Sequence, residues 1–296
     1  MEIRKILVPT DFSANAQVAL DAAVELARPL GASLHLLHVI HLPVQISPIE
    51  GMSLPVAYWE GLRRFADSRL AEQKAKVVAQ GIACTTESIE DIASFAISEA
   101  AKRQHSDLIV MGSRGLTGLK HFALGSVAER TVRAAECPVL TVKHAAKLSE
   151  LNTILVPVDF SDPSDAALAL AKSIVRRLGR GHLILAHAYY IPAELQQYVM
   201  RNDGFVQRIS MGVSRELDKL VAALRAEGIS AESATVEGTP ERVIQDLVHS
   251  KKVDLVALGT HGRRGMSHLM LGSVAERVLR FSEVPVLTVR AKPAQS

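Results

Sequence analysis

The sequence predicts an α/β fold: two tandem doubly wound domains, each with a five-stranded parallel sheet flanked by helices. Three observations predict it. The chain has 296 residues, which is more than a single hydrophobic core usually serves. One pattern of residues occurs twice along the chain. Within each copy, short apolar runs alternate with longer segments of helical period, which is typical of βαβ units around a parallel sheet.

The internal repeat locates the two domains. Residues 6–13 read ILVPTDFS, and residues 154–161 repeat them as ILVPVDFS. The heptapeptide LGSVAER at 124–130 recurs unchanged at 271–277, and each copy closes with PVLTV. The repeat predicts an internal duplication that covers nearly the whole chain.

We expect the first domain at residues 1–146 and the second at 151–292, with the boundary between Ala145 and Leu151. The connection is short and is not rich in Gly or Ser. A flexible tether usually is, so we expect closely packed domains.

The strands follow from the apolar runs, several of which are apolar almost throughout, as strands covered by helices on both faces must be. The expected strands lie near residues 3–9, 33–40, 83–89, 107–112 and 138–142 in the first copy, and near 152–158, 182–188, 230–236, 254–259 and 285–289 in the second. Residues 18–27 and 166–171 read as amphipathic helices with small residues toward the sheet.

Composition and charge narrow the function classes. The net charge is +3, and there is no dense run of Lys and Arg, so nothing indicates nucleic-acid binding. No apolar run approaches the roughly 18 residues that a membrane span needs. The N-terminus lacks the pattern of a signal peptide, so we expect a cytoplasmic protein. Cys84 and Cys137 both lie in the first copy, and we expect reduced, structural thiols.

A glycine pattern follows the fourth strand of each copy. In the first copy, Gly112 and Gly115 are followed by nine residues and then by Gly125-Ser126. In the second copy, Gly259 and Gly262 are followed by nine residues and then by Gly272-Ser273. Glycines let a backbone approach a ligand closely, and a helix start supplies unpaired N–H donors, so the pattern favours binding of phosphate groups. The spacing is neither that of a P-loop nor the dinucleotide GxGxxG.

Each glycine loop also allows a structural interpretation. Glycines are common in turns, and the segments from Ser126 to Glu129 and from Ser273 to Glu276 fit a capping box. Asp11 and Asp159, after the first strand of each copy, also have two interpretations. Each carboxylate could contact a ligand, or it could cap the following helix or accept neighbouring N–H groups.

Together, Gly-x2-Gly-x9-Gly-Ser and Val-Pro-x-Asp-Phe-Ser in both copies resemble the ATP-binding branch of the universal stress protein family, in tandem form. The resemblance implies a five-stranded parallel sheet, adenine near the aspartate and near the backbone after the second strand, and phosphates and ribose at the glycine loop. The residues that it assigns to cofactor binding are Asp11, Val39, Gly112, Gly115, Gly125, Ser126, Val127, Asp159, Ala188, Gly238, Gly259, Gly262, Gly272, Ser273 and Val274.

The first copy departs from the family pattern at one turn. The second copy has Gly238 after its third strand, where the first has Asp91. The extra side chain and charge leave nucleotide binding by the first site open. His38 and His187, which precede Val39 and Ala188, are interpreted as packed strand histidines. Arg114, Lys120, Arg263 and Arg264 could help to neutralise a triphosphate.

The leading hypothesis is an ATP-binding regulator of the stress response that carries ATP with Mg²⁺ and acts through an unidentified protein partner. The closing strands resemble the edge through which family members dimerise, which implies an internal pseudo-dimer; a homodimer of two chains is also open. The alternatives are a slow ATPase or phosphoryl-transfer enzyme, and a structural protein whose loops bind no nucleotide. We identify no catalytic residue and no independent metal site.

Overall fold

The computed structural model describes residues 2–40, 56–115, 124–191, 204–262 and 271–291. Contacts within the chain divide it into two compact units, Glu2–Ser149 and Glu150–Ser296. Each unit is a domain with its own strands and helices.

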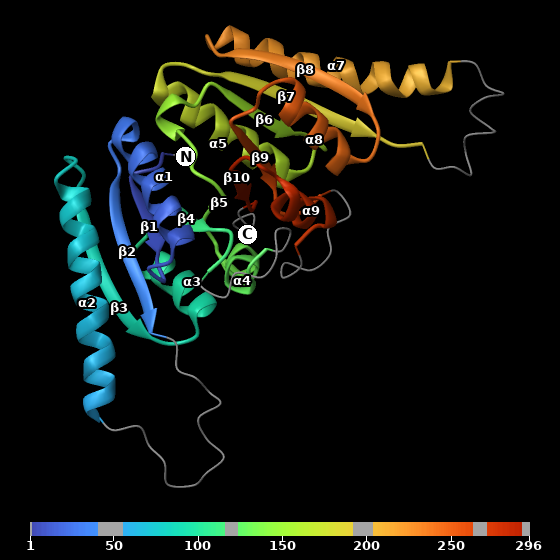
Figure 1. The fold of residues 1–296 in the computed structure, drawn as a ribbon. Coiled ribbons are helices and arrows are strands. Elements are labelled where there is room, and N and C mark those ends of the chain that lie inside the picture. The colour runs from blue at the N-terminus through green and yellow to red at the C-terminus, as the bar shows by residue number, and fades with distance from the viewer. Residues whose placement is uncertain (1, 41–55, 116–123, 192–203, 263–270, 292–296) are drawn as a thin grey trace, which may run out of the picture. The chain divides into compact units, whose positions relative to one another are not determined.

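The first domain alternates strands and helices (Figure 1). Its elements are β1 (Lys5–Pro9), α1 (Ala14–Leu30), β2 (Ser33–Ile40), α2 (Val56–Val78), β3 (Cys84–Glu90), α3 (Ala93–Arg103), β4 (Leu108–Gly112), α4 (Ser126–Ala134) and β5 (Val139–Val142). The strands pair in parallel in the order β3-β2-β1-β4-β5.

The second domain repeats this plan. Its elements are β6 (Thr153–Pro157), α5 (Asp162–Leu178), β7 (His182–Tyr189), α7 (Phe205–Ala226), β8 (Ser230–Glu237), α8 (Pro240–Ser250), β9 (Leu255–Gly259), α9 (Ser273–Phe281) and β10 (Val286–Val289). The parallel order is β8-β7-β6-β9-β10, which corresponds strand by strand to that of the first domain.

The predicted fold class is therefore confirmed, and each predicted strand forms with its ends within two residues of the expected ones. The largest difference is at the first strand, which begins at Lys5 and not at Ile3. The backbone N–H groups of Arg4 and Lys5 donate to Oδ2 of Asp107 at 2.8 and 2.9 Å. The side chain of Asp107 therefore takes the place of a neighbouring strand at this end.

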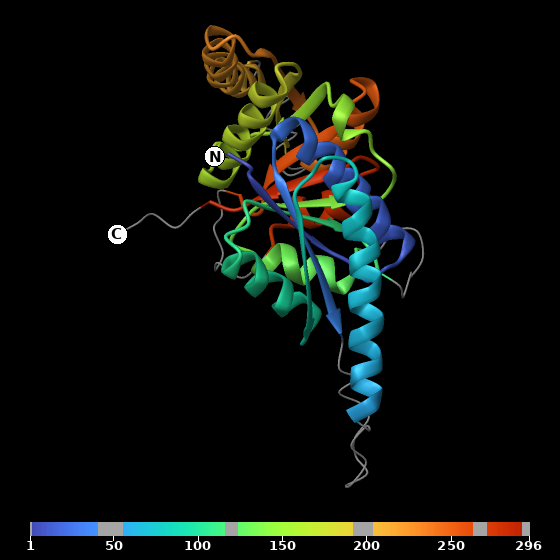
Figure 2. The ribbon, with the colours of Figure 1, turned by 90° about the vertical axis from the view of Figure 1, so that its left-hand side faces the viewer.

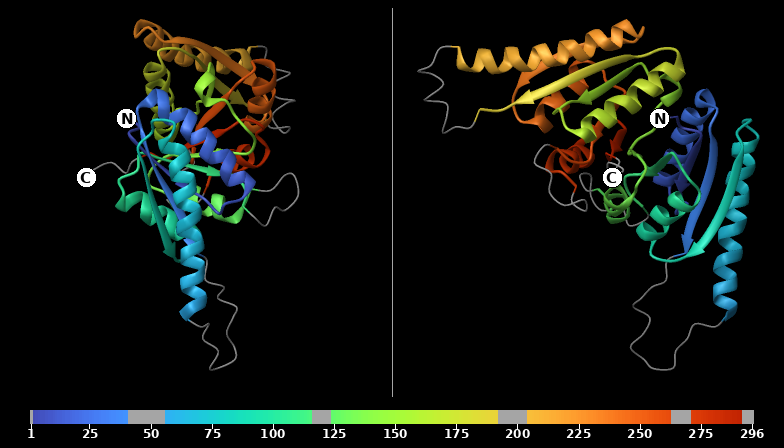
Figure 3. Two further views of the ribbon diagram at one scale, coloured as in Figure 1. Left: turned by 60° about the vertical axis from the view of Figure 1, so that its left-hand side comes forward. Right: turned by 180° about the vertical axis from the view of Figure 1, so that it is seen from behind.

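The strands are buried because helices cover both faces of each sheet. Ile6, Leu7 and Val8 of β1 have no exposed surface. Right-handed crossovers place α1 and α2 on one face of the first sheet and α3 and α4 on the other. Figure 2 shows α2 running alongside β3, and Figure 3 shows α7 in the corresponding place along β8.

Helix α1 shows how the local sequence fits this packing. The hydroxyl of Ser13 accepts from the N–H of Ala16, and Gly31 ends the helix with a left-handed φ of 65°. Ala19, Ala22 and Ala23 are buried, and their small side chains let the helix lie close to the sheet.

The strand order creates one switch point in each sheet. From β1 the chain moves outward through β2 and β3, and it then returns to the other side of β1 as β4. Ligands of doubly wound sheets bind at such a switch point, beyond the carboxyl ends of the strands. The switch points here are the ends of β1 and β4 and the ends of β6 and β9.

Candidate functional site

The aspartate and the second glycine of each loop meet across the switch point. Asp11 follows β1, and Gly115 lies three residues after the end of β4. A Cβ placed on Gly115 would lie only 2.7 Å from Oδ2 of Asp11, and a Cβ placed on Gly262 would lie at the same 2.7 Å from Oδ2 of Asp159. A side chain at this position would have to displace the carboxylate, and the two domains agree on this.

The other oxygen of each aspartate is bonded locally. Oδ1 of Asp11 accepts from the N–H of Ser13 at 3.0 Å, and Oδ1 of Asp159 accepts from the N–H of Ser161 at 3.1 Å. The aspartates thus accept neighbouring N–H groups, as one of the two interpretations had it, but Ser13 and Ser161 are the helix caps. Oδ1 orients each carboxylate, while Oδ2 lies against the glycine loop.

The first glycine of each loop has a packing role. A Cβ on Gly112 would lie 3.0 Å from the carbonyl oxygen of Asn15, and a Cβ on Gly259 would lie 2.6 Å from Cβ of Pro163. The start of the first helix therefore presses on the end of the fourth strand in both domains. This contact holds the loop and the aspartate turn together.

The third glycine closes the loop onto its strand. The N–H of Gly125 donates to the carbonyl of Ser113 at 2.8 Å, and that of Gly272 donates to the carbonyl of Thr260 at the same distance. A Cβ on either glycine would lie 3.1 Å from that carbonyl oxygen. Both ends of each loop are therefore anchored at the carboxyl end of the fourth strand.

The predicted capping boxes are wrong. Gly125 is the N-cap of α4 and Gly272 that of α9, so Ser126 and Ser273 are one position too far along the chain to cap. The glutamates form ion pairs one turn later instead, Glu129 with Arg133 at 2.7 Å and Glu276 with Arg280 at 2.8 Å. A glycine cap has no side chain to accept a hydrogen bond, so it leaves the first N–H groups of each helix for other partners.

The remaining predicted residues lie near the same edge. Ser126, Val127 and Ser273 are exposed in the first turns of α4 and α9, and Val274 is half-buried there. Val39 and Ala188 are half-buried near the ends of β2 and β7. Of the four predicted cations, Arg114 is half-buried in the first loop, whereas Lys120, Arg263 and Arg264 lie outside the described residues.

The turn after the third strand differs between the domains. Gly238 has a φ of 148°, a conformation that side chains rarely adopt, and its N–H donates to the carbonyl of Tyr189 at 2.9 Å. Asp91 lies outside the positive-φ region, and its Oδ1 accepts from the N–H of Ile92 at 2.6 Å. The substitution seen in the sequence thus changes the backbone as well as the charge.

The acidic residues at the first helix also differ. Asp162 and Asp165 in the first turn of α5 join Asp159, whereas the first turn of α1 has no acidic residue. Desolvation, then the charge of Asp162 and that of Asp159, raise the pKa of Asp165. The second site is the more negative of the two at this end.

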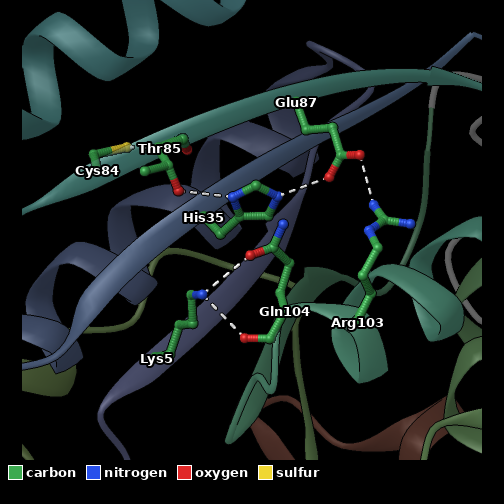
Figure 4. Close-up of polar contacts among 7 residues, drawn as sticks. All are labelled: Lys5, His35, Cys84, Thr85, Glu87, Arg103 and Gln104. Carbon is green, nitrogen blue, oxygen red and sulfur yellow. Dashed lines mark hydrogen bonds and ion pairs between the residues drawn. The ribbon is translucent and has the colours of Figure 1, made fainter.

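A second polar cluster lies toward the opposite, amino-terminal edge of the first sheet (Figure 4). His35 of β2 is 3% exposed; its Nδ1 lies 2.8 Å from Oγ1 of Thr85, and its Nε2 lies 3.2 Å from Oε2 of Glu87. Arg103 donates to the other oxygen of Glu87 at 2.5 Å. Burial lowers the pKa of His35, although Glu87 opposes this. In the second domain Ile184 occupies the strand position of His35.

The described residues contain neither a metal-binding cluster nor a membrane-spanning helix. No group of three or more His, Cys, Asp or Glu side chains there could hold a metal ion. Among the helices described, none has both the length and the apolar character to cross a membrane. Burial raises the pKa of the two thiols, to about 11 for Cys84 and about 12 for Cys137.

Comparisons with known proteins identify relatives along the whole chain. A universal stress protein of Methanocaldococcus jannaschii is 36% identical over 148 residues, covering 49% of this chain and 84% of the relative. A universal stress protein of Mycolicibacterium smegmatis is 27% identical over 299 residues and 97% of each chain. The crystal structure of a universal stress protein from Archaeoglobus fulgidus aligns with a TM-score of 0.77 at 27% identity, covering 99% of this chain and 100% of the other.

The family model named "Universal stress protein family" matches twice, at residues 2–143 and 150–290. Each match spans one of the two duplicated sheets and includes its aspartate, its glycine loop and its closing strand. The chain therefore belongs to the universal stress protein family and carries two copies of the family's domain in tandem.

Proposed function

We propose that each domain binds ATP with Mg²⁺ at its switch point, and that the chain is a nucleotide-dependent regulator of the stress response. One observation supports this most strongly. In both domains the carboxylate after the first strand lies against the second glycine of the loop, and the loop leads into a helix with a glycine N-cap.

The two ends of this site suit the two ends of an adenine nucleotide. A carboxylate accepts hydrogen bonds and repels phosphate, so we assign the aspartate to contact with the adenine base. The helix start offers N–H donors and a partial positive charge, so we assign it to binding of the phosphates. Neighbouring strands lie about 4.8 Å apart, which puts both groups within reach of one ligand.

Magnesium would arrive with the nucleotide. No cluster of metal-binding side chains occurs among the described residues, and Mg²⁺ is commonly held by phosphate oxygens and water with few protein ligands. Membership of the family and the resemblance to its ATP-binding branch support the choice of ATP. We place this activity in the cytoplasm and assign the response to a protein partner of the loaded state.

Calorimetric titration of ATP with Mg²⁺ tests the proposal. The wild type should bind two moles per chain, and Gly115→Glu and Gly262→Glu one mole each, because the new carboxylate collides with the aspartate and repels phosphate. The matched controls are Gly61→Glu and Gly212→Glu, where nothing lies within 4 Å of the added Cβ. Two moles bound by both loop variants would overturn the assignment.

Mass spectrometry of the extracted protein tests the alternative of a structural protein, which would carry no adenine nucleotide. A phosphate-release assay tests the enzyme alternative. Glu129 and Glu276, the glutamates in the first turns of α4 and α9, are both held in ion pairs. A rate that vanishes in a Gly262 variant whose ATP binding survives would favour the enzyme.

A further inference from the structure

A histidine contacts the aspartate turn of the first domain on two sides. Nδ1 of His38 lies 2.8 Å from the carbonyl oxygen of Thr10, the residue before Asp11. The imidazole ring stacks on Phe12, the residue after Asp11, with 4.4 Å between ring centroids and 22° between planes. His38 therefore contacts both neighbours of the aspartate.

The second domain repeats the arrangement with a different residue before the aspartate. Nδ1 of His187 lies 2.6 Å from the carbonyl oxygen of Val158, and its ring lies 5.5 Å from that of Phe160. The contact is therefore independent of whether Thr or Val precedes the aspartate. Two copies that differ elsewhere have kept it.

The turn that these histidines contact has an unusual backbone. Phe12 has a φ of 61° and Phe160 a φ of 59°. A bulky side chain rarely adopts a left-handed φ, and such residues persist only where the surroundings hold them. This conformation turns the chain from the strand into the first helix and places the aspartate side chain at the switch point.

The contacts also determine the state of each ring. A carbonyl oxygen can only accept, so Nδ1 of His38 and of His187 carries the proton and donates it. Replacement by a side chain without a donor at that position leaves the carbonyl without this bond. Asparagine keeps an N–H donor close to the position of Nδ1 but has no ring to stack.

We propose that His38 and His187 are positioning residues for nucleotide binding: each holds its aspartate turn so that the carboxylate stays against the glycine loop. This inference rests on the proposed function. It assigns the histidines to the base end of the site, because the turn carries the carboxylate, whereas the phosphate donors belong to α4 and α9.

The test measures the affinities of ATP and of inorganic tripolyphosphate in proteins with a single working site. His187→Leu and His187→Asn are made in the Gly115→Glu chain, and His38→Leu and His38→Asn in the Gly262→Glu chain. We expect the Leu variants to bind ATP about three- to tenfold more weakly, the range for loss of one net hydrogen bond, and to bind tripolyphosphate as before. Asn should recover part of the ATP affinity.

Matched controls lie on the same two strands. His35→Leu on β2 and His182→Leu on β7 change a histidine near the amino-terminal edge of the sheet, and both should leave the ATP affinity unchanged.

Equal ATP affinity in the His38→Leu and His187→Leu variants and in their parents would overturn the inference while leaving the proposed function intact. Equal weakening of both ligands in the Leu and Asn variants would show a role in folding alone and would also overturn it. If the parents bind no ATP, the proposed function fails and the inference fails with it.

Discussion

The two domains agree in the geometry of the switch point and differ at several charged positions elsewhere. Asp11 and Asp159 each lie 2.7 Å from the Cβ that a side chain at their glycine would have, and both turns contain a phenylalanine with a positive φ. In contrast, buried His35 has Ile184 as its counterpart, and Asp91 has Gly238. The comparison teaches that the geometry of the switch point is the common requirement, while the surroundings of each site have diverged.

The largest expected effect is a difference between the first glycines of the two loops. An added Cβ at Gly259 would lie 2.6 Å from Cβ and 2.8 Å from the carbonyl carbon of Pro163, whereas at Gly112 the closest atom is 3.0 Å away. Overpacking costs about 1–3 kcal/mol, so Gly259→Ala should reach the upper part of this range and Gly112→Ala the lower. Urea unfolding of each variant measures the difference. Equal losses would show that the two helix starts press equally on their strands.

The next largest effect is expected from exchanging the residues at the turn after the third strand of each domain, Asp91 and Gly238. Gly238→Asp places a side chain at a φ of 148°, with its Cβ 3.1 Å from Cγ2 of Val243. We expect a loss of about 1–2 kcal/mol of stability, from strained backbone, together with weaker ATP binding by the second domain. The reciprocal Asp91→Gly should change stability by less than about 1 kcal/mol, because Asp91 needs no positive φ. A larger loss for Asp91→Gly than for Gly238→Asp would contradict this account.

Acid should destabilise the first domain through His35. Burial lowers the pKa of His35 in the folded state, so below the ordinary value of about 6.5 the unfolded state binds more protons than the folded one. The stability that neutral His35 contributes is therefore present above about pH 6.5 and is lost as the pH falls toward the lowered pKa. Lys5, Glu87 and Arg103 are the charged groups around the ring.

The loss of stability of the first domain in acid can be measured with the single tryptophan, Trp59 of α2, because its fluorescence reports unfolding of this domain. As the pH is lowered from 7.5 to 5.5, we expect the urea concentration at the unfolding midpoint to decrease in the wild type. It should decrease less in His35→Ile, which has the residue of the second domain at this position. A wild-type midpoint that stays constant over this interval would rule out His35 as a source of acid sensitivity. Desolvation raises the pKa of Glu87, but the hydrogen bonds and charges of Arg103 and His35 together outweigh it and lower this pKa, so Glu87 adds a loss of stability at more acidic pH.

The smallest effect concerns the acidic first turn of α5. The pKa of Asp165 is raised in the folded state, so this group favours folding below its unfolded pKa, and that contribution is lost as the pH rises through the folded pKa. At neutral pH its charge is therefore unfavourable. Asp165→Asn should raise stability slightly, within the roughly 0.5 kcal/mol typical of surface changes. Lower stability of Asp165→Asn at pH 7 would show that the carboxylate has a favourable partner.

Much of the fold could be predicted because its signals are local. Apolar runs and helical periods are properties of short segments, and they placed each predicted strand within two residues of its position. The duplication gave a second, independent reading of every element. The glycine pattern of the candidate site was found in the same way, from its spacing in two copies, whereas Asp11 and Asp159 were assigned to the site from the resemblance to the family.

The failures arose where one residue of register decides the outcome. Ser126 and Glu129 have the spacing of a capping box, which requires Ser126 to be the N-cap. The N-cap of α4 is Gly125, one residue earlier, and Ser126 is the first residue of the helix. The histidines were interpreted as packed strand residues, which their half-burial fits, but their contacts with the aspartate turn were missed. Their recurrence before Val39 and Ala188 was the only signal that could have revealed them.

By itself, the sequence determined the duplication, the alternation of strands and helices, and the residue types at both loops. Only the tertiary structure decided that the Asp11 carboxylate lies against Gly115 and that His38 contacts the turn that carries Asp11. The physical reason is that such contacts depend on which strands are neighbours. Strand order results from the packing of the whole sheet, and no local period of the sequence encodes it.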